Sequence, residues 1–136
     1  MSSARPEGHK EDGSPYRVLI VDDSVFAIKQ LNQILTSEGF EVIDTALDGN
    51  DALEKYQKHH PQVDLVTMDV TMPGMDGLSC LEKIMQFDKG AKVVMVSALG
   101  KQDLVKRSFL VGAKSFIVKP LEREKVLERL RAVLHP

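Results

Sequence analysis

The sequence predicts an α/β fold in which five parallel strands form one sheet with helices on both faces. Two observations lead to this prediction. Short apolar runs rich in β-branched residues alternate five times with segments whose apolar residues recur at helical spacing. The runs are apolar almost throughout, which is typical of strands that are covered on both faces of a parallel sheet.

The first strand and helix are predicted near the N-terminus. Arg17–Val21 places Val, Leu and Ile in one short run, which favours a strand. Ser24–Glu38 has an apolar stripe at helical spacing, and Gly39 is expected to stop this helix at its C-terminus. The stripe consists of Ala27, Ile28, Leu31, Ile34 and Leu35.

The second strand differs from the first in its pattern. Glu41–Ala46 alternates between polar and apolar residues, which indicates an edge strand. Asp48 is expected to cap a helix from about Gly49 to Lys58, because its side chain can accept a hydrogen bond from the first turn. Pro61 ends this helix, since the residue before a proline rarely stays helical.

The third strand is followed by a loop rich in proline and glycine. Val63–Asp69 is predicted as a strand that is apolar except for Asp64 and Thr67. The segment 71–77, Thr-Met-Pro-Gly-Met-Asp-Gly, is predicted as a loop. Helical spacing resumes over Leu78–Gln86.

Two further strands and two further helices complete the pattern. Lys92–Ser97 is the fourth predicted strand, and a helix is expected over about Lys101–Val111 before Gly112. Ser115–Lys119 is the fifth strand. The final helix has the clearest periodicity, carried by Val126, Leu127, Leu130, Val133 and Leu134.

The alternation of strands and helices restricts the possible topologies. Parallel strands joined by helices require right-handed crossovers, which place helices on both faces of the sheet. A barrel of eight such units needs about 250 residues, whereas this chain has 136. The predicted architecture is therefore a flavodoxin-like sheet with the strand order 2-1-3-4-5.

Composition and charge argue against several classes of protein. A formal net charge of −2 gives no basis for binding to nucleic acid, and no apolar stretch reaches the ~20 residues of a membrane span. Residues 1–15 are polar and rich in Gly, Pro, Ser and charge, which predicts a disordered tail before a folded domain over residues 16–136. The single cysteine, Cys80, fits a reducing compartment, and we expect a cytoplasmic monomer.

Polar side chains stand where four of the strands end, and the carboxyl ends of parallel strands meet at the ligand-binding edge of a sheet. Asp22 and Asp23 follow the first strand, Asp69 ends the third, Ser97 ends the fourth and Lys119 ends the fifth. Three crowded carboxylates raise one another's pKa or require a counter-ion, and an all-oxygen site suits Mg²⁺. This set resembles a phosphoryl-transfer site in which Asp69 attacks phosphorus while Lys119 and Ser97 contact phosphoryl oxygens.

Each of these residues also has a simpler structural explanation. An acidic pair after a strand often caps a helix, a serine can cap a turn, and a lysine at a strand end can be solvated. These explanations account poorly for the joint occurrence of all the residues at successive strand ends.

Four motifs carry a resemblance that covers the chain from about Arg17 to Leu134. They are Val-Asp-Asp-Ser at 21–24, Met-Asp-Val-Thr-Met-Pro-Gly-Met-Asp-Gly at 68–77, Ser-Ala-Leu-Gly at 97–100 and Phe-Ile-Val-Lys-Pro at 116–120. In this combination and order the chain resembles response-regulator receiver domains, and most of all the single-domain chemotaxis type, which is CheY-like.

The resemblance implies how the residues at the strand ends are used. Asp69 is expected to accept a phosphoryl group from a phosphohistidine of a chemotaxis-type sensor histidine kinase. Asp22, Asp23, Asp69 and the backbone carbonyl of Thr71 are expected to bind Mg²⁺, and Lys119 is expected to contact the phosphoryl group.

The resemblance also implies a switch. Ser97 and Phe116 match the hydroxyl and aromatic pair of the family, so Ser97 is expected to swing toward the phosphoryl group while Phe116 turns inward. Phe116 stands where the enteric chemotaxis protein has Tyr, so no phenol hydrogen bond can form. Thr71 and Leu99 occupy the positions that tune phosphoryl lifetime, and neither orients water well, so we expect slow self-dephosphorylation and reliance on a separate phosphatase.

These implications favour a phospho-accepting signalling switch over an enzyme that turns over a substrate. Control of flagellar rotation through a flagellar motor switch protein is the expected output, because no output domain follows Pro136. One alternative is a phosphorelay intermediate that passes phosphate to a histidine phosphotransfer protein. Another is a metal-dependent aspartyl-phosphate phosphatase, which normally needs a second acid as proton donor and a cap, and the sequence shows neither.

Overall fold

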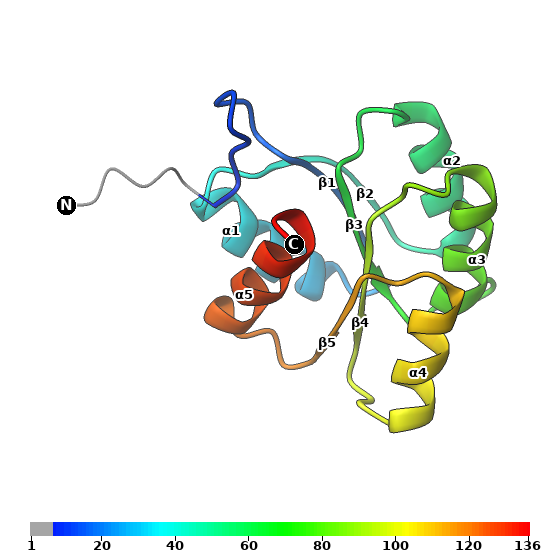
Figure 1. Ribbon diagram of the computed structural model, residues 1–136. Helices are drawn as coiled ribbons and strands as arrows, with labels where there is room; N and C mark the ends of the chain where they lie inside the picture. The colour runs from blue at the N-terminus through cyan, green and yellow to red at the C-terminus, as the bar shows by residue number, and fades with distance from the viewer. Residues whose placement is uncertain (1–6) are drawn as a thin grey trace.

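The computed structural model describes residues 7–136 and contains the predicted alternation of strands and helices (Figure 1). The strands are β1 (Arg17–Val21), β2 (Glu41–Ala46), β3 (Leu65–Asp69), β4 (Val93–Ser97) and β5 (Ser115–Val118). The helices are α1 (Val25–Ser37), α2 (Gly49–His59), α3 (Gly77–Phe87), α4 (Gln102–Val111) and α5 (Arg123–Leu134). The strands pair in parallel in the order β2-β1-β3-β4-β5, which confirms the predicted fold class and topology.

The helices form one layer on each face of the sheet (Figure 1). Helices α1 and α5 cover one face, where Leu31 and Leu130 belong to the same buried cluster as Ile20 of β1. Helices α2, α3 and α4 cover the other face, where Tyr56 and Leu81 pack with the strand residues that point that way. Successive side chains of a strand thus reach opposite faces, and the central strand β3 is buried along its whole length. None of the helices in residues 7–136 is long and apolar enough to cross a membrane.

Two predicted helix boundaries are set by side chains that cap them. Ser24 accepts a hydrogen bond from the backbone N of Ala27 at 3.2 Å, and Asp48 accepts one from the backbone N of Asp51 at 2.8 Å. Gly39, the predicted stop after α1, has a φ of +86°. This left-handed conformation is one that glycine adopts without steric cost, so a glycine is suited to end the helix there.

Strand β3 begins two residues later than predicted, at Leu65 rather than Val63. Asp64 hydrogen-bonds to the neighbouring strand through its carboxylate as well as through its backbone. Its Oδ2 accepts from the backbone N of Arg17 at 2.8 Å, and its own N donates to the Arg17 carbonyl at 2.9 Å. The spacing of apolar residues does not show that a side chain will replace a backbone acceptor, so it could not predict this start of the strand.

The disordered tail predicted over residues 1–15 is wrong for residues 7–15, and residues 1–6 lie outside the described residues. Residues 8–16 form a short hairpin in which His9 bridges Pro15, and the Gly8 backbone N donates to the Glu38 carbonyl at 2.8 Å. The Tyr16 ring lies 6.2 Å from the ring of Phe40. Polar composition predicts no core, but here the backbone itself packs against the turn between α1 and β2.

Ion pairs join this hairpin to two distant segments. The Lys10 ammonium lies 3.2 Å from the Asp64 carboxylate, and the Arg131 guanidinium of α5 lies 2.7 Å from the Glu7 carboxylate. Exposed pairs of this kind contribute about 0–1 kcal/mol each, so the buried backbone of Gly8 is the firmer attachment.

The fit of Gly8 can be tested by adding a methyl group. A Cβ at Gly8 would lie 2.3 Å from the Phe40 backbone N, so we expect Gly8→Ala to reduce the free energy of unfolding by about 1–3 kcal/mol in urea denaturation. Gly90→Ala is the matched control, because the nearest atom there is Asp88 Oδ1 at 3.4 Å. Equal stability of the two variants would show that the hairpin does not pack in this way.

Candidate functional site

The predicted acidic residues meet at the carboxyl edge of the sheet. Asp22 directly follows β1 and Asp69 ends β3, which is the neighbouring strand. One carboxylate oxygen from each of Asp22, Asp23 and Asp69 lies within 4.8 Å of the other two. Asp22 and Asp69 are each only 5% exposed, whereas Asp23 is exposed, so the cluster is open to solvent on one side.

Asp22 is held in place by backbone hydrogen bonds. Its N donates to the Ala46 carbonyl at 3.0 Å, and its Oδ1 accepts from the Ser24 backbone N at 2.9 Å. The cap of α1 is provided by Ser24, whose hydroxyl accepts from Ala27, and not by either aspartate. The explanation of the acidic pair as a helix cap is therefore wrong.

One cation reaches the cluster from Lys119, which directly follows β5 because this strand ends at Val118, one residue earlier than predicted. The Lys119 ammonium donates to Asp22 Oδ2 at 3.0 Å and lies 3.7 Å from Asp69 Oδ1. Burial opposes the charged form of Lys119, but the hydrogen bond and charge of Asp22, together with the charge of Asp69, outweigh it and raise the pKa of this lysine. Lys119 is therefore a charged bridge between two carboxylates. Its peptide bond to Pro120 is cis.

The electrostatics of Asp69 differ from those of a surface carboxylate. Burial and the charge of Asp22 together raise the pKa of Asp69 to about 6, and the charge of Lys119 only partly opposes this shift. Three carboxylates against one ammonium leave the site with excess negative charge. A divalent cation with a preference for oxygen ligands, such as Mg²⁺, fits both the charge and the donor atoms.

Ser97 lies on β4, the strand next to β3, whereas Phe116 lies on β5, one strand further from Asp69. Ser97, which ends β4 and is 2% exposed, accepts a hydrogen bond on Oγ from the Leu99 backbone N at 2.9 Å. Phe116 of β5 lies beside Met95 in the strand register and is 5% exposed. From the sequence, the Phe116 ring was expected to move from the surface into the core when the switch operates. In this structure the ring is already buried, because its position in β5 faces the core cluster under α2, α3 and α4.

The loop between β3 and α3 carries Thr71, whose carbonyl is expected to bind the metal. The side chain of Thr71 is exposed, whereas Met72 next to it is only 7% exposed and belongs to the core. The loop ends at Asp76, which caps α3 by accepting from the Ser79 backbone N at 2.8 Å. The loop is thus attached to the core through Met72 and to α3 through Asp76, while the side chain of Thr71 is exposed to solvent.

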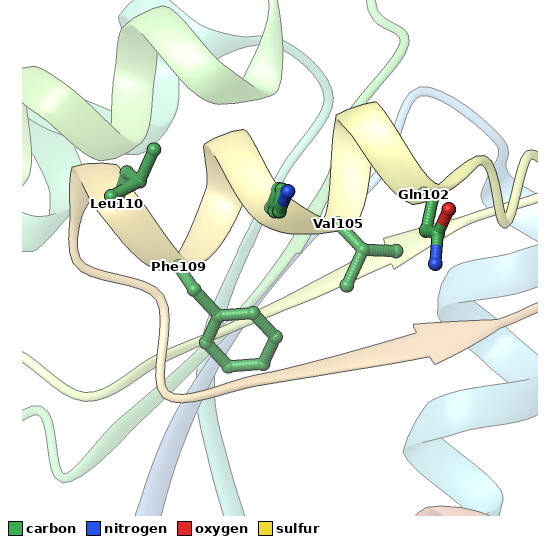
Figure 2. A pocket seen from close by; sticks show the side chains of 5 residues that line it. Gln102, Val105, Phe109 and Leu110 are labelled. Carbon is green, nitrogen blue, oxygen red and sulfur yellow. The ribbon is translucent and has the colours of Figure 1, made fainter.

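A groove along α4 is a feature that the sequence analysis did not single out. It has a volume of about 450 Å³ and is lined by Gln102, Val105, Lys106, Phe109 and Leu110. Figure 2 shows Val105 and Phe109 projecting from the same side of the helix. Leu110 is 84% exposed and Phe109 is 47% exposed. The sequence could have indicated this groove, because α4 carries apolar residues on more than one side.

Comparison with known proteins identifies the family. The model of the response regulator receiver domain matches residues 18–131. The chain belongs to this family. Chemotaxis protein CheY of Treponema pallidum is 65% identical over 129 residues, which cover 95% of this chain and 90% of that protein. Chemotaxis protein CheY of Bacillus subtilis is 47% identical over 120 residues, which cover 88% of this chain and 98% of that protein.

A solved structure agrees with this assignment. The crystal structure of the CheX–CheY–BeF3–Mg²⁺ complex from Borrelia burgdorferi matches with a TM-score of 0.96 and 58% identity, and the match covers 98% of this chain and 100% of that chain. The protein is a CheY-like receiver domain, a signalling switch of chemotaxis. Receiver domains bind Mg²⁺ at an acidic pocket, and the three aspartates of this receiver domain have the donor set for it.

The raised pKa of Asp69 makes stability depend on pH in the metal-free receiver domain. Between about pH 4 and 6 the unfolded chain loses this proton while the folded chain keeps it, so ionisation of Asp69 disfavours the folded state above pH 6. We expect Asp69→Asn to be more stable than wild type by about 1–3 kcal/mol at pH 8, and the difference to vanish toward pH 4. Urea denaturation in EDTA measures the free energy of unfolding of each protein at pH 8 and at pH 4. A difference between the two proteins that does not change with pH would contradict the expectation.

Proposed function

We propose that this receiver domain accepts a phosphoryl group on Asp69 from a phosphohistidine of a chemotaxis-type sensor histidine kinase. The observation that carries the proposal is the setting of Asp69: a buried carboxylate with two further aspartates beside it and the Lys119 ammonium 3.7 Å away. Asp22, Asp23, Asp69 and the backbone carbonyl of Thr71 are the proposed ligands of Mg²⁺. Bound there, the ion supplies positive charge that stabilises the phosphoryl oxygens.

The proposed transfer is a displacement at phosphorus. An oxygen of Asp69 forms the new P–O bond, the P–N bond to the donor imidazole breaks, and its electron pair returns to the imidazole nitrogen. The ammonium of Lys119 offsets the charge of a second phosphoryl oxygen. The Ser97 hydroxyl, which accepts from Leu99, keeps its own hydrogen to donate to a third.

Phosphorylation is proposed to act through Ser97 and Phe116. A phosphoryl group adds about −1.5 to −2 charge and strong acceptor oxygens beside Ser97. A hydrogen bond from the Ser97 hydroxyl to a phosphoryl oxygen would then compete with the bond that Ser97 accepts from Leu99. Because Phe116 already lies inside, the phosphorylated form is proposed to hold this ring in its buried position rather than to bring it there. The two side chains thus bias a population of states that exists before phosphorylation.

The proposed output surface consists of α4, β5 and α5. Its exposed apolar residues include Leu110 of α4 and Val118 at the end of β5, which is 46% exposed. The groove along α4 offers apolar contacts beside the charge of Lys106 (Figure 2). We propose a flagellar motor switch protein as the partner on this surface, and hence control of flagellar rotation.

Other parts of the proposed function rest on the relatives and the sequence. The relative from Borrelia burgdorferi forms a complex with CheX, and we propose that a CheX-type protein also binds this receiver domain. Self-dephosphorylation is proposed to be slow, because the side chains of Thr71 and Leu99 carry no acid or carboxamide to orient water, so a separate phosphatase shortens the signal. A cytoplasmic monomer remains the proposed form.

The phosphoacceptor is tested by transfer from a panel of phosphorylated histidine kinases. We expect wild type to become labelled and Asp69→Asn to lose all labelling while its circular dichroism spectrum is unchanged. Asp76→Asn is the matched control, because Asp76 is an exposed carboxylate in the same loop and asparagine still caps a helix. Labelling of Asp69→Asn at the wild-type level would assign the phosphoryl group to another residue.

The switch is tested by separating phosphorylation from partner binding. We expect Ser97→Ala to accept the phosphoryl group but to lose most of the gain in affinity for the motor switch protein, because the methyl group cannot bond the phosphoryl oxygen. Ser97→Thr retains the hydroxyl and should keep the gain. Full activation of Ser97→Ala, measured by pull-down of the phosphorylated form, would reject the coupling through Ser97.

A further inference from the structure

Two glycines, Gly49 and Gly77, lie very close to the backbone of the segment that joins β3 to α3. A Cβ at Gly77, the first residue of α3, would lie 2.1 Å from the Asp69 carbonyl oxygen. A Cβ at Gly49, the first residue of α2, would lie 2.7 Å from the Met75 carbonyl oxygen and 2.9 Å from the Met75 Cβ. Both approaches are too close for any residue with a side chain. The loop is therefore held at its two ends, once by α3 and once by α2.

The contact from α2 comes from an element that contributes no residue to the acidic cluster. Gly49 is buried, and its carbonyl accepts a hydrogen bond from the Cys80 thiol of α3 at 3.3 Å. Asp48 before it caps the helix. Helices α2 and α3 pack side by side, so the first turn of α2 is fixed from two directions (Figure 1).

The loop between β3 and α3 is easier to displace than α2, because fewer of its residues are buried. Of the six residues between Val70 and Gly77 only Met72 is buried; the side chains of Thr71, Pro73 and Asp76 are exposed, and Gly74 has a φ of +73°. Segments with few buried contacts yield at a lower free-energy cost than packed helices. A methyl group at Gly49 would therefore move Met75 and the loop rather than α2.

We propose that Gly49 is a positioning residue of the magnesium and phosphoryl site, because its bare backbone sets the place of the loop that carries Thr71. This inference rests on the proposed function, in which the Thr71 carbonyl binds the metal. Gly49 itself touches neither the metal nor the phosphoryl group. It acts through Met75, four residues along the chain from Thr71.

The test measures Mg²⁺ binding directly, by isothermal titration calorimetry on the metal-free protein. We expect Gly49→Ala to weaken Mg²⁺ binding about tenfold, as is common when a group that orients a metal ligand is disturbed. Cys80→Ala is the matched control: it removes the other contact of Gly49 in the same α2–α3 interface, so it should lower Tm but leave the Kd for Mg²⁺ unchanged. Loss of stability alone is thereby separated from displacement of the loop.

A kinetic measurement with phosphoramidate as the phosphodonor adds a second readout. We expect the Mg²⁺ concentration at half-maximal phosphorylation to rise about tenfold in Gly49→Ala, and saturating Mg²⁺ to restore most of the maximal rate. A purely structural role for Gly49 would lower the active fraction without moving this midpoint.

The possible results separate this inference from the proposed function. Failure of wild type to bind Mg²⁺ would remove the proposed function and this inference with it. An unchanged Kd in folded Gly49→Ala, beside normal binding by wild type, would remove this inference alone. If Gly49→Ala does not fold, Met75→Gly tests the contact from the loop side, because it removes the Cβ that lies against Gly49; binding weakened about threefold supports the inference, and an unchanged Kd overturns it.

Discussion

The structure depends on keeping excess negative charge at a half-buried edge of the sheet. Asp69 is almost fully buried, yet it shares its surroundings with two other carboxylates, and Lys119 balances only part of their charge. In water such charges would separate, but each is attached to the end of a strand or to the residues just after it. The stability of the packed sheet offsets this electrostatic cost, and a bound cation lowers it.

The rigidity of the core is what makes this arrangement possible. Every residue of β3 is buried, and helices cover both faces of the sheet, so the strand that ends in Asp69 cannot shift to relax the repulsion. The hydrogen bonds of Asp22 to Ala46 and Ser24 fix the second carboxylate in the same way. Strain is therefore kept at the site, where binding can release it.

Helix α4 is much less firmly packed than the core strands. Ser108 is the only buried residue of this helix, whereas each of the other four helices has three or more. A helix with so few buried contacts has a low cost of displacement, and the loop before it starts at Ser97, whose hydroxyl holds Leu99. The Ser97 hydroxyl thus lies between the fully buried strand β4 and the helix with the fewest buried residues. Such a contrast suits a switch, because a change of charge at the rigid site can be expressed as movement of the loose element.

The alternation of apolar runs and helical stripes was enough to predict the sheet, its strand order and the edge at which Asp22, Asp69 and Lys119 meet. These features follow from local periodicity and from the handedness of crossovers, both of which can be read along the chain. The predicted start of β3 was wrong because the Asp64 side chain bonds to the neighbouring strand, and the predicted tail was wrong for residues 7–15 because the Gly8 backbone packs against the turn between α1 and β2. Composition carries no information about such contacts.

The residue types at the strand ends, and hence the chemistry open to the site, were determined by the sequence alone. The tertiary structure decided how that chemistry is held: that Ser24 rather than the acidic pair caps α1, that Phe116 lies inside, and that Gly49 presses on Met75. Each of these depends on distances between segments that are far apart along the chain. Periodicity assigns a residue to a face of its own element, but only packing decides which atom of another element it meets.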